Sequence, residues 1–253
     1  VMLGGTYPEL YALYGKHFLA ASIMAAPATF LVAKMLIPET GEPLTRGNIK
    51  VEVEKTSANI IDAAAAGAAD GVKLAINIAA MLLAFVALIA MINAIIGWFG
   101  DLHLSGYQSL NMMLNQGAAG AAPVTLNLGL ILGYVLAPVA WVIGIDWNDA
   151  VIAGGLIGQK IVLNEFIAYL QLSQIPVGDA PGAISEHSRL ILTYALCGFA
   201  NFASIAIQIG GIGSLAPERR SDLARFGLRA VLGGTIATLM TATIAGVLLH
   251  FGV

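Results

Sequence analysis

Four long stretches with almost no charge dominate this chain and limit what it can fold into. They cover residues 17–36, 74–99, 190–215 and 226–251. A helix needs about 20 mostly apolar residues to cross the hydrocarbon core of a bilayer, and each stretch reaches that length. The chain is 58% hydrophobic and 11% charged, whereas an ordinary soluble domain carries about 25% charged residues. The sequence therefore predicts an all-α integral membrane protein in a lipid bilayer.

A fifth apolar region, residues 124–172, is interrupted by proline, glycine and charged residues. It is too interrupted for two clean spans and too apolar for a loop. Two shorter helices that enter the membrane and return fit it, because broken backbone is tolerated at depth where protein or a cavity surrounds it. We place this re-entrant hairpin at about residues 146–172.

Glycine also interrupts the third stretch, so a broken helix is expected over residues 188–215. One break is expected near Gly198, and a second at Gly210, Gly211 and Gly213, because glycine weakens a helix. We expect the last span, residues 226–251, to be a continuous helix.

The sequence divides into a first part, residues 1–123, and a second part, residues 124–253. The first part holds the spans 17–36 and 74–99, with a small-residue helix at 56–72 between them. That helix lies either along the membrane surface or in a cytoplasmic loop, and the sequence leaves both open. Residues 101–123 show no clear period.

Lysine and arginine are distributed unevenly between the loops and predict an orientation. Residues 37–73 and 215–229 each contain four of them, whereas residues 98–159 and 171–188 contain none. Positive residues stay on the cytoplasmic side. The spans then alternate: 17–36 runs inward, 74–99 outward, 190–215 inward and 226–251 outward. The region 124–172 begins and ends outside, as a re-entrant hairpin must.

Several classes of function find no support. The net charge is −3, so there is no basic footprint for nucleic acid. Phosphate loops, dinucleotide motifs and HExxH are absent from the sequence, its four histidines have no metal-ligand spacing, and Cys197 is its single cysteine. We therefore predict no cofactor. The chain begins at Val1 in apolar sequence, and we expect a further N-terminal portion.

Glu165 stands out because a carboxylate within an apolar run is costly in a membrane. Asn164 beside it is also polar. One interpretation is a structural glutamate that joins helices, protonated or paired with Lys160. The other is a hydrogen-bond acceptor for a substrate hydroxyl.

A second polar group lies in residues 197–204 (CGFANFAS). Asn201 and Ser204 are three residues apart, which places them on one face of a helix. An unwound helix with such groups is the usual construction of a transporter site at the membrane midplane. The alternative is helix packing, in which Gly198 and the alanines permit close approach and Asn201 joins neighbouring helices.

These segments resemble the concentrative, sodium-coupled nucleoside transporters. Residues 158–170 (GQKIVLNEFIAYL) are similar to the second re-entrant hairpin of that family, and residues 197–205 (CGFANFASI) to its broken seventh helix. Residues 20–27 (AASIMAAP), followed by Pro38-Glu39-Thr40, match a third signature. The resemblance covers nearly the whole chain.

The resemblance implies a secondary active transporter that imports nucleosides, driven by a sodium gradient, and that forms a homotrimer in the bacterial inner membrane. It implies that Glu165, Asn201 and Ser204 bind the nucleoside ribose, and that Phe199 lines the same pocket. It also implies half of an inverted-repeat fold. The family's first hairpin is not in this sequence, so we expect the sodium site mainly on the missing N-terminal portion.

Two other functions remain as alternatives. An intramembrane enzyme could use Glu165 as an acid or base, but it needs a nucleophile or metal partner, and the sequence shows neither. A membrane scaffold subunit could use the same polar groups to join helices, and it predicts no saturable uptake.

Overall fold

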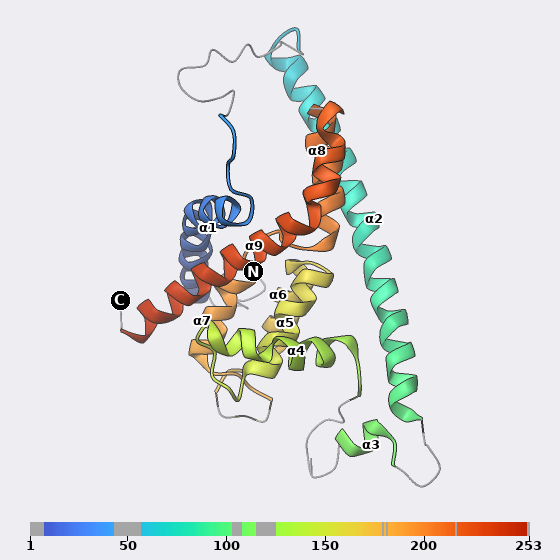
Figure 1. The fold of residues 1–253 in the computed structure, drawn as a ribbon, viewed down its shortest axis with the longest axis vertical. Coiled ribbons are helices and arrows are strands. Elements are labelled where there is room, and N and C mark those ends of the chain that lie inside the picture. Colours follow the sequence, from blue (N-terminus) through green and yellow to red (C-terminus); the bar gives the residue numbers. More distant parts are fainter. Residues whose placement is uncertain are drawn as a thin grey trace.

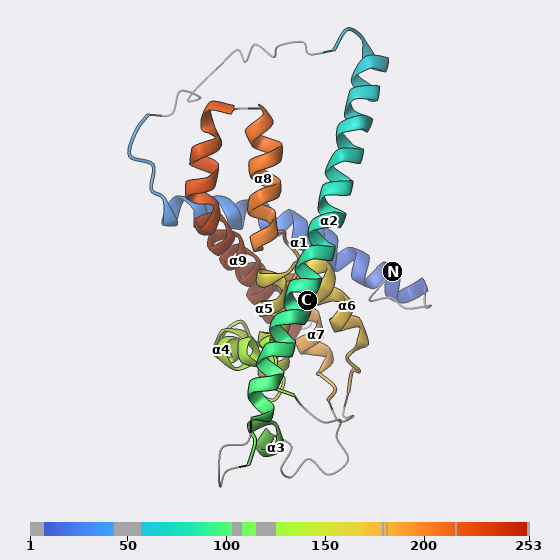
Figure 2. The ribbon, with the colours of Figure 1, turned by 90° about the vertical axis from the view of Figure 1, so that its right-hand side faces the viewer.

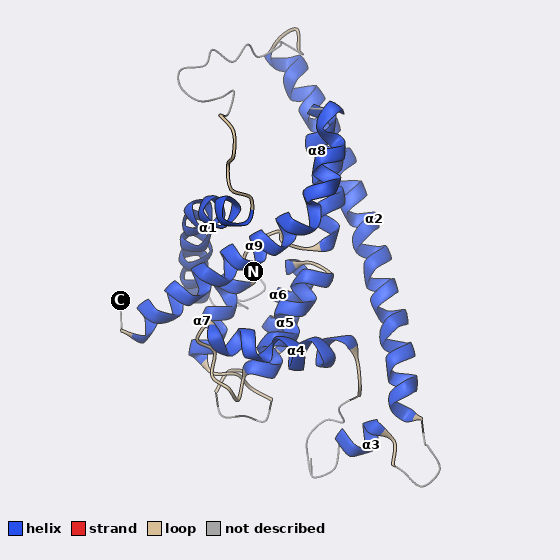
Figure 3. Cartoon of the chain, viewed as in Figure 1, coloured by secondary structure: helices blue, strands red, loops and turns tan. Residues whose placement is uncertain are grey.

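The computed structural model describes residues 8–42, 57–102, 108–114, 125–178, 180, 182–215 and 217–251. Within these ranges the regular elements are helices (Figure 3), and β pairing is limited to an isolated bridge between Val177 and Ile184. The elements are α1 (Pro8–Leu36), α2 (Ile60–Asp101), α3 (Leu110–Leu114), α4 (Leu128–Val142), α5 (Ala150–Val162), α6 (Glu165–Gln174), α7 (Glu186–Ala195), α8 (Phe202–Leu215), the 3₁₀ turn η1 (Pro217–Arg219) and α9 (Arg220–His250). The described chain is helical, as predicted.

The first and last predicted spans lie on helices that extend further than expected. Residues 17–36 belong to α1, which begins at Pro8, and residues 226–251 fall mostly on α9, which begins at Arg220. Within these helices, Tyr14–Leu36 and Arg220–Leu249 are long and apolar enough to cross a membrane. Large apolar side chains of α1, such as Phe30 and Met35, are exposed, which suits contact with lipid.

The expected separate helix at 56–72 is wrong, because α2 runs without interruption from Ile60 to Asp101 and contains the predicted span 74–99. The Asn59 side chain caps its start by accepting from the backbone N–H of Asp62 at 2.9 Å. No proline follows until beyond the helix, and alanine favours its continuation. At about 1.5 Å per residue, 42 residues give about 63 Å. This exceeds a hydrocarbon core of about 30 Å, so α2 reaches beyond it.

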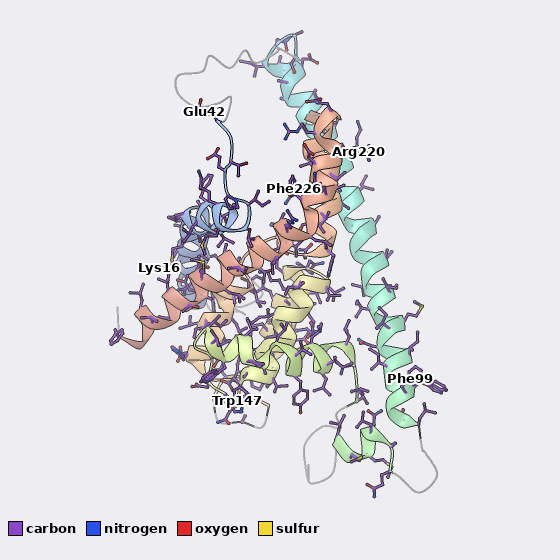
Figure 4. The ribbon with its side chains drawn as sticks, in the orientation of Figure 1. Lys16, Glu42, Phe99, Trp147, Arg220 and Phe226 are labelled. Carbon is purple, nitrogen blue, oxygen red and sulfur yellow. The ribbon has the colours of Figure 1, made fainter. Side chains whose placement is uncertain are left out.

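Figures 1 and 2 show α2 as a long helix along one side of the molecule, with α3 near its C-terminal end. Phe99, near that end, points away from the other helices (Figure 4). The α3 helix lies in the stretch 101–123 that showed no period, and residues 103–107 and 115–123 are outside the described residues. Among the described residues Asn111 of α3 donates to the Asp101 carboxylate at 2.7 Å, which ties α3 to the end of α2.

The region 124–172 contains three helices, not the two expected. The predicted hairpin, 146–172, corresponds to α5 and α6, and α4 is a further helix that packs on α5. Glycines allow this close packing: a Cβ on Gly133 would lie 2.6 Å from the Val151 carbonyl oxygen, and one on Gly154 would lie 2.6 Å from the Gly133 carbonyl oxygen. Close approach at small residues is typical of membrane helices.

The broken helix predicted over 188–215 is interrupted once within the described chain. It ends as α7 at Ala195 and resumes as α8 at Phe202, so the break near Gly198 is confirmed. The second expected break is wrong, because α8 continues through Gly210, Gly211 and Gly213 to Leu215. Isolated glycines weaken a helix by about 1 kcal/mol each, which the rest of the helix can outweigh.

One buried core joins helices from both predicted parts of the sequence. It includes Ala21 of α1, Ala140 of α4, Leu172 of α6, Ile191 of α7 and Ala242 of α9. The packing therefore crosses the division we placed at residue 123, since α1 lies with the later helices. In Figures 1 and 2, α1 crosses α9, and α8 lies beside the first turns of α9.

Candidate functional site

The break between α7 and α8 brings non-helical backbone close to α9. Gly198 lies in the break, and a Cβ there would approach the Thr238 Cγ2 of α9 to 2.7 Å. A larger residue at position 198 would therefore push the break and α9 apart. Short local hydrogen bonds hold the turn: Cys197 N–H donates to the Tyr194 carbonyl at 3.0 Å, and Ala200 N–H donates to the Gly198 carbonyl at 2.9 Å.

Asn201 and Ser204 cap the start of α8 reciprocally. The Asn201 Oδ1 accepts from the backbone N–H of Ser204 at 2.7 Å, and the Ser204 hydroxyl oxygen accepts from the backbone N–H of Asn201 at 3.4 Å. The same hydroxyl donates to the Asn201 carbonyl at 2.6 Å. This is a capping box, which satisfies N–H groups that a helix start leaves unpaired. It explains locally why the chain returns to a helix at Phe202. Both side chains are buried.

Glu165 is the first residue of α6, placed there by a cap on its own helix. Asn164 precedes it, and the Asn164 Oδ1 accepts from the backbone N–H of Ile167 at 3.0 Å. The half-buried Glu165 Oε2 accepts from the Asn201 side-chain amide at 3.1 Å, although the two residues are 36 apart in sequence. The structure thus joins Glu165, Asn201 and Ser204 in one hydrogen-bonded chain between the starts of two helices. Their role in substrate binding stays a prediction.

Phe199 lies in the break with its side chain 72% exposed. It lines a cavity of about 1160 Å³ between α1, the break, α8 and α9. Ser204 also lines this cavity, but Glu165 and Asn201 do not. Figure 4 labels Phe226 of α9, which also lines it. Small-molecule sites usually have volumes of about 300–1,000 Å³, so the cavity is large enough for a nucleoside-sized ligand.

Side chains of α5 and α6 cap the carbonyl end of α7. The Lys160 Nζ of α5 donates to the Ala195 carbonyl at 3.1 Å, and the Tyr169 hydroxyl of α6 donates to the Thr193 carbonyl at 2.6 Å. The last carbonyls of a helix lack partners within that helix. The α5–α6 pair supplies partners for two of these carbonyls.

The charges around the break match the helix dipoles. Lys160, a cation, contacts the C-terminal end of α7, where the dipole is negative. Glu165, an anion, contacts the cap of α8, where the dipole is positive. Both side chains come from the α5–α6 pair, on either side of the residues that connect its helices. The α5–α6 pair therefore contacts both ends of the break.

Lys160 is the residue whose role the sequence did not indicate. We considered it as an ion-pair partner of Glu165, but its hydrogen bonds go to the Ala195 carbonyl and to the Thr238 hydroxyl. Ion pairs found among the described residues do not include either Lys160 or Glu165. The one sequence feature that could have indicated this role is the position of a lysine inside an apolar segment. In the described part of the chain, no three His, Cys, Asp or Glu residues gather as a metal site.

The chain matches a family model. Residues 17–246 match the model described as "Na+ dependent nucleoside transporter C-terminus". An uncharacterized transporter, YutK, from Bacillus subtilis (strain 168) is 48% identical over 241 residues, which cover 93% of this chain and 54% of that protein. Sodium/nucleoside cotransporter 1 from Mus musculus is 40% identical over 260 residues, covering 97% of this chain and 37% of the mouse protein.

Solved structures agree in fold. A structure of CNTnw in an inward-facing substrate-bound state is 44% identical with a TM-score of 0.72, over 96% of this chain and 53% of that one. A CNTnw variant in an intermediate state is 43% identical with a TM-score of 0.74, over 95% of this chain and 54% of that one. This chain thus spans about half the length of the Bacillus subtilis relative and of the solved structures, and 37% of the mouse protein. It belongs to the family of Na+-dependent nucleoside transporters and matches the C-terminal region of that family.

Proposed function

We propose that this chain forms the nucleoside-binding half of a sodium-coupled importer. Membership of the family makes it part of an integral membrane protein. The observation that carries the proposal is the hydrogen-bonded chain of Glu165, Asn201 and Ser204 at a helix break, beside the cavity that Phe199 lines. A helix break with polar groups is where secondary transporters hold their substrates.

The remaining hydrogen-bonding capacity of these groups favours a ligand with hydroxyl donors. Ser204 uses its hydroxyl proton on the Asn201 carbonyl, so it can offer a ligand a lone pair but no donor. Glu165, when ionised, can only accept, and its Oε1 is not engaged by Asn201. Asn201 accepts the cap hydrogen bond at its Oδ1 and donates one amide N–H to Glu165, so it keeps one amide N–H for a ligand. Two acceptors and one donor group suit the vicinal hydroxyls of a ribose.

The lengths of α5 and α6 support a re-entrant hairpin. They contain 13 and 10 residues, or about 20 Å and 15 Å of helix. Neither can cross a hydrocarbon core of about 30 Å, so the pair enters the membrane and turns back at Leu163 and Asn164. We extend the proposal to half of an inverted-repeat fold, a homotrimer and, given the bacterial relatives, the bacterial inner membrane.

Transport is favoured over catalysis because the named relatives are transporters. An enzyme that used Glu165 as an acid or base would need a nucleophile or metal ion nearby. In the described residues, the hydrogen-bond partner of the Glu165 carboxylate is the Asn201 amide, which supplies neither.

The test is uptake by the full-length protein in proteoliposomes. Radiolabelled uridine uptake is expected to saturate and to require an inward sodium gradient, with choline as the control cation. Equal uptake in sodium and choline would contradict sodium coupling. Stable, correctly inserted protein with no saturable uptake of any nucleoside in either cation would instead favour the scaffold function.

A further inference from the structure

Lys160 is buried with no exposed surface, and the proposed substrate contacts do not involve it. Its Nζ lies 3.1 Å from the Ala195 carbonyl oxygen and 2.8 Å from the Thr238 hydroxyl oxygen. The first oxygen belongs to the last turn of α7, and the second to α9. The Lys160 amino group thus connects α5, α7 and α9 at the C-terminal end of α7, where the break begins.

The direction of these hydrogen bonds follows from the neighbouring groups. The Thr238 hydroxyl donates its single proton to the Thr235 carbonyl at 2.9 Å, so it can only accept from Lys160. The Ala195 carbonyl is also an acceptor. Lys160 therefore donates to both, as an ammonium group does. Carboxylates whose side chains the structure describes form no ion pair with it, so its hydrogen-bond partners are neutral oxygens, and Glu165 acts on it only by longer-range Coulombic attraction.

Carbonyl and hydroxyl oxygens at the C-terminal end of a half-helix form the kind of environment that holds a coupling cation in secondary transporters. The negative end of the helix dipole adds to the attraction. Here a tethered ammonium already occupies that environment.

We propose that Lys160 is a fixed cation at the end of α7, which takes the place of a mobile ion there and positions the break. It is a positioning residue: it holds α7 at Ala195, and thereby sets how residues 197–201 present Phe199 and Asn201. The link to substrate rests on the proposed function, whereas the link to the conformation of the break does not.

Two substitutions in the full-length protein distinguish a cationic role from packing. Lys160→Met keeps the apolar stem and removes the charge, whereas Lys160→Ala also opens space for a small cation. In both, kcat/KM for uridine uptake is expected to fall by about tenfold or more, the change for one charge-assisted hydrogen bond. Methylammonium is expected to restore uptake several-fold in Lys160→Ala, measured against equimolar choline. It should not restore Lys160→Met, because the methionine stem fills the space.

A matched pair on α9 tests the contact itself. Thr238 and Thr241 are both buried and lie one turn apart, but the Thr241 hydroxyl donates to the Thr238 carbonyl and does not contact Lys160. Thr238→Val is expected to lower kcat/KM in the same direction as Lys160→Met, and Thr241→Val to leave it near wild type. An equal loss in both variants would overturn the positioning role.

Hydrogen–deuterium exchange gives a readout that does not depend on transport. Exchange in residues 196–201 of purified protein is expected to rise in Lys160→Ala, to fall again with methylammonium, and to stay unchanged in residues 242–248. If wild-type protein imports no nucleoside, the proposed function fails, and exchange still decides the role of Lys160. Stable Lys160→Met with wild-type exchange, or Lys160→Ala that does not respond to methylammonium, would overturn the inference.

Discussion

Replacing Glu165 by glutamine tests the substrate contact with little change of shape. In the structure, Oε2 accepts from the Asn201 amide, which leaves Oε1 for a ligand hydroxyl. A hydrogen bond to a charged group contributes about 1.5–3 kcal/mol and a neutral one about 0.5–1.5 kcal/mol. The loss for one bond is then about 1–1.5 kcal/mol, which corresponds to roughly a tenfold weaker Kd for uridine.

The assay is equilibrium binding of uridine to purified full-length protein, with 2′,3′-dideoxyuridine as the second ligand. Because the analogue lacks the hydroxyl donors, Glu165→Gln is expected to change its affinity far less than that of uridine. Glu186→Gln is the matched control, since Glu186 is also the first residue of a helix but is exposed. If stable Glu165→Gln protein binds uridine as tightly as wild type, the proposal that Glu165 contacts the ribose is wrong. Equal weakening of both ligands would indicate a structural role instead.

Three other predictions follow from the topology, the assembly and the packing. Ala180→Cys is expected to react with an impermeant thiol reagent from outside and Ser221→Cys from inside, because of the lysine and arginine distribution; reaction of both from one side would contradict the orientation. Mass measurement of the full-length protein in nanodiscs is expected to give three copies, and an active monomer would contradict the trimer. Gly133→Ala should lower the thermal midpoint, because its Cβ would lie 2.6 Å from a backbone oxygen of α5 and such overpacking costs about 1–3 kcal/mol. Gly67→Ala, in open space on α2, is the control and should not lower it.

Local sequence was sufficient for α1, for α9 and for the position of the break between α7 and α8. Apolar runs of spanning length predicted α1 and α9, and Gly198 predicted the break between α7 and α8. Caps and helix interruptions depend on residues within one turn of each other, so a single sequence contains that information. Where the local signals were weak, the expectations were wrong: the alanine-rich start of α2 did not form a separate helix, and the glycines of α8 did not end it.

The tertiary structure decided which of these local features meet. That Glu165 reaches Asn201, that Lys160 donates to Ala195 and Thr238 and not to Glu165, and that α1 packs with the later helices are all contacts between distant residues. An isolated glutamate or lysine in an apolar run indicates only that a buried partner is needed. Which partner it finds depends on how the helices pack, and here the glycines between α4 and α5 and the close approach of Gly198 to α9 set that packing. Sequence by itself determined the polar groups and the break, and packing determined the site.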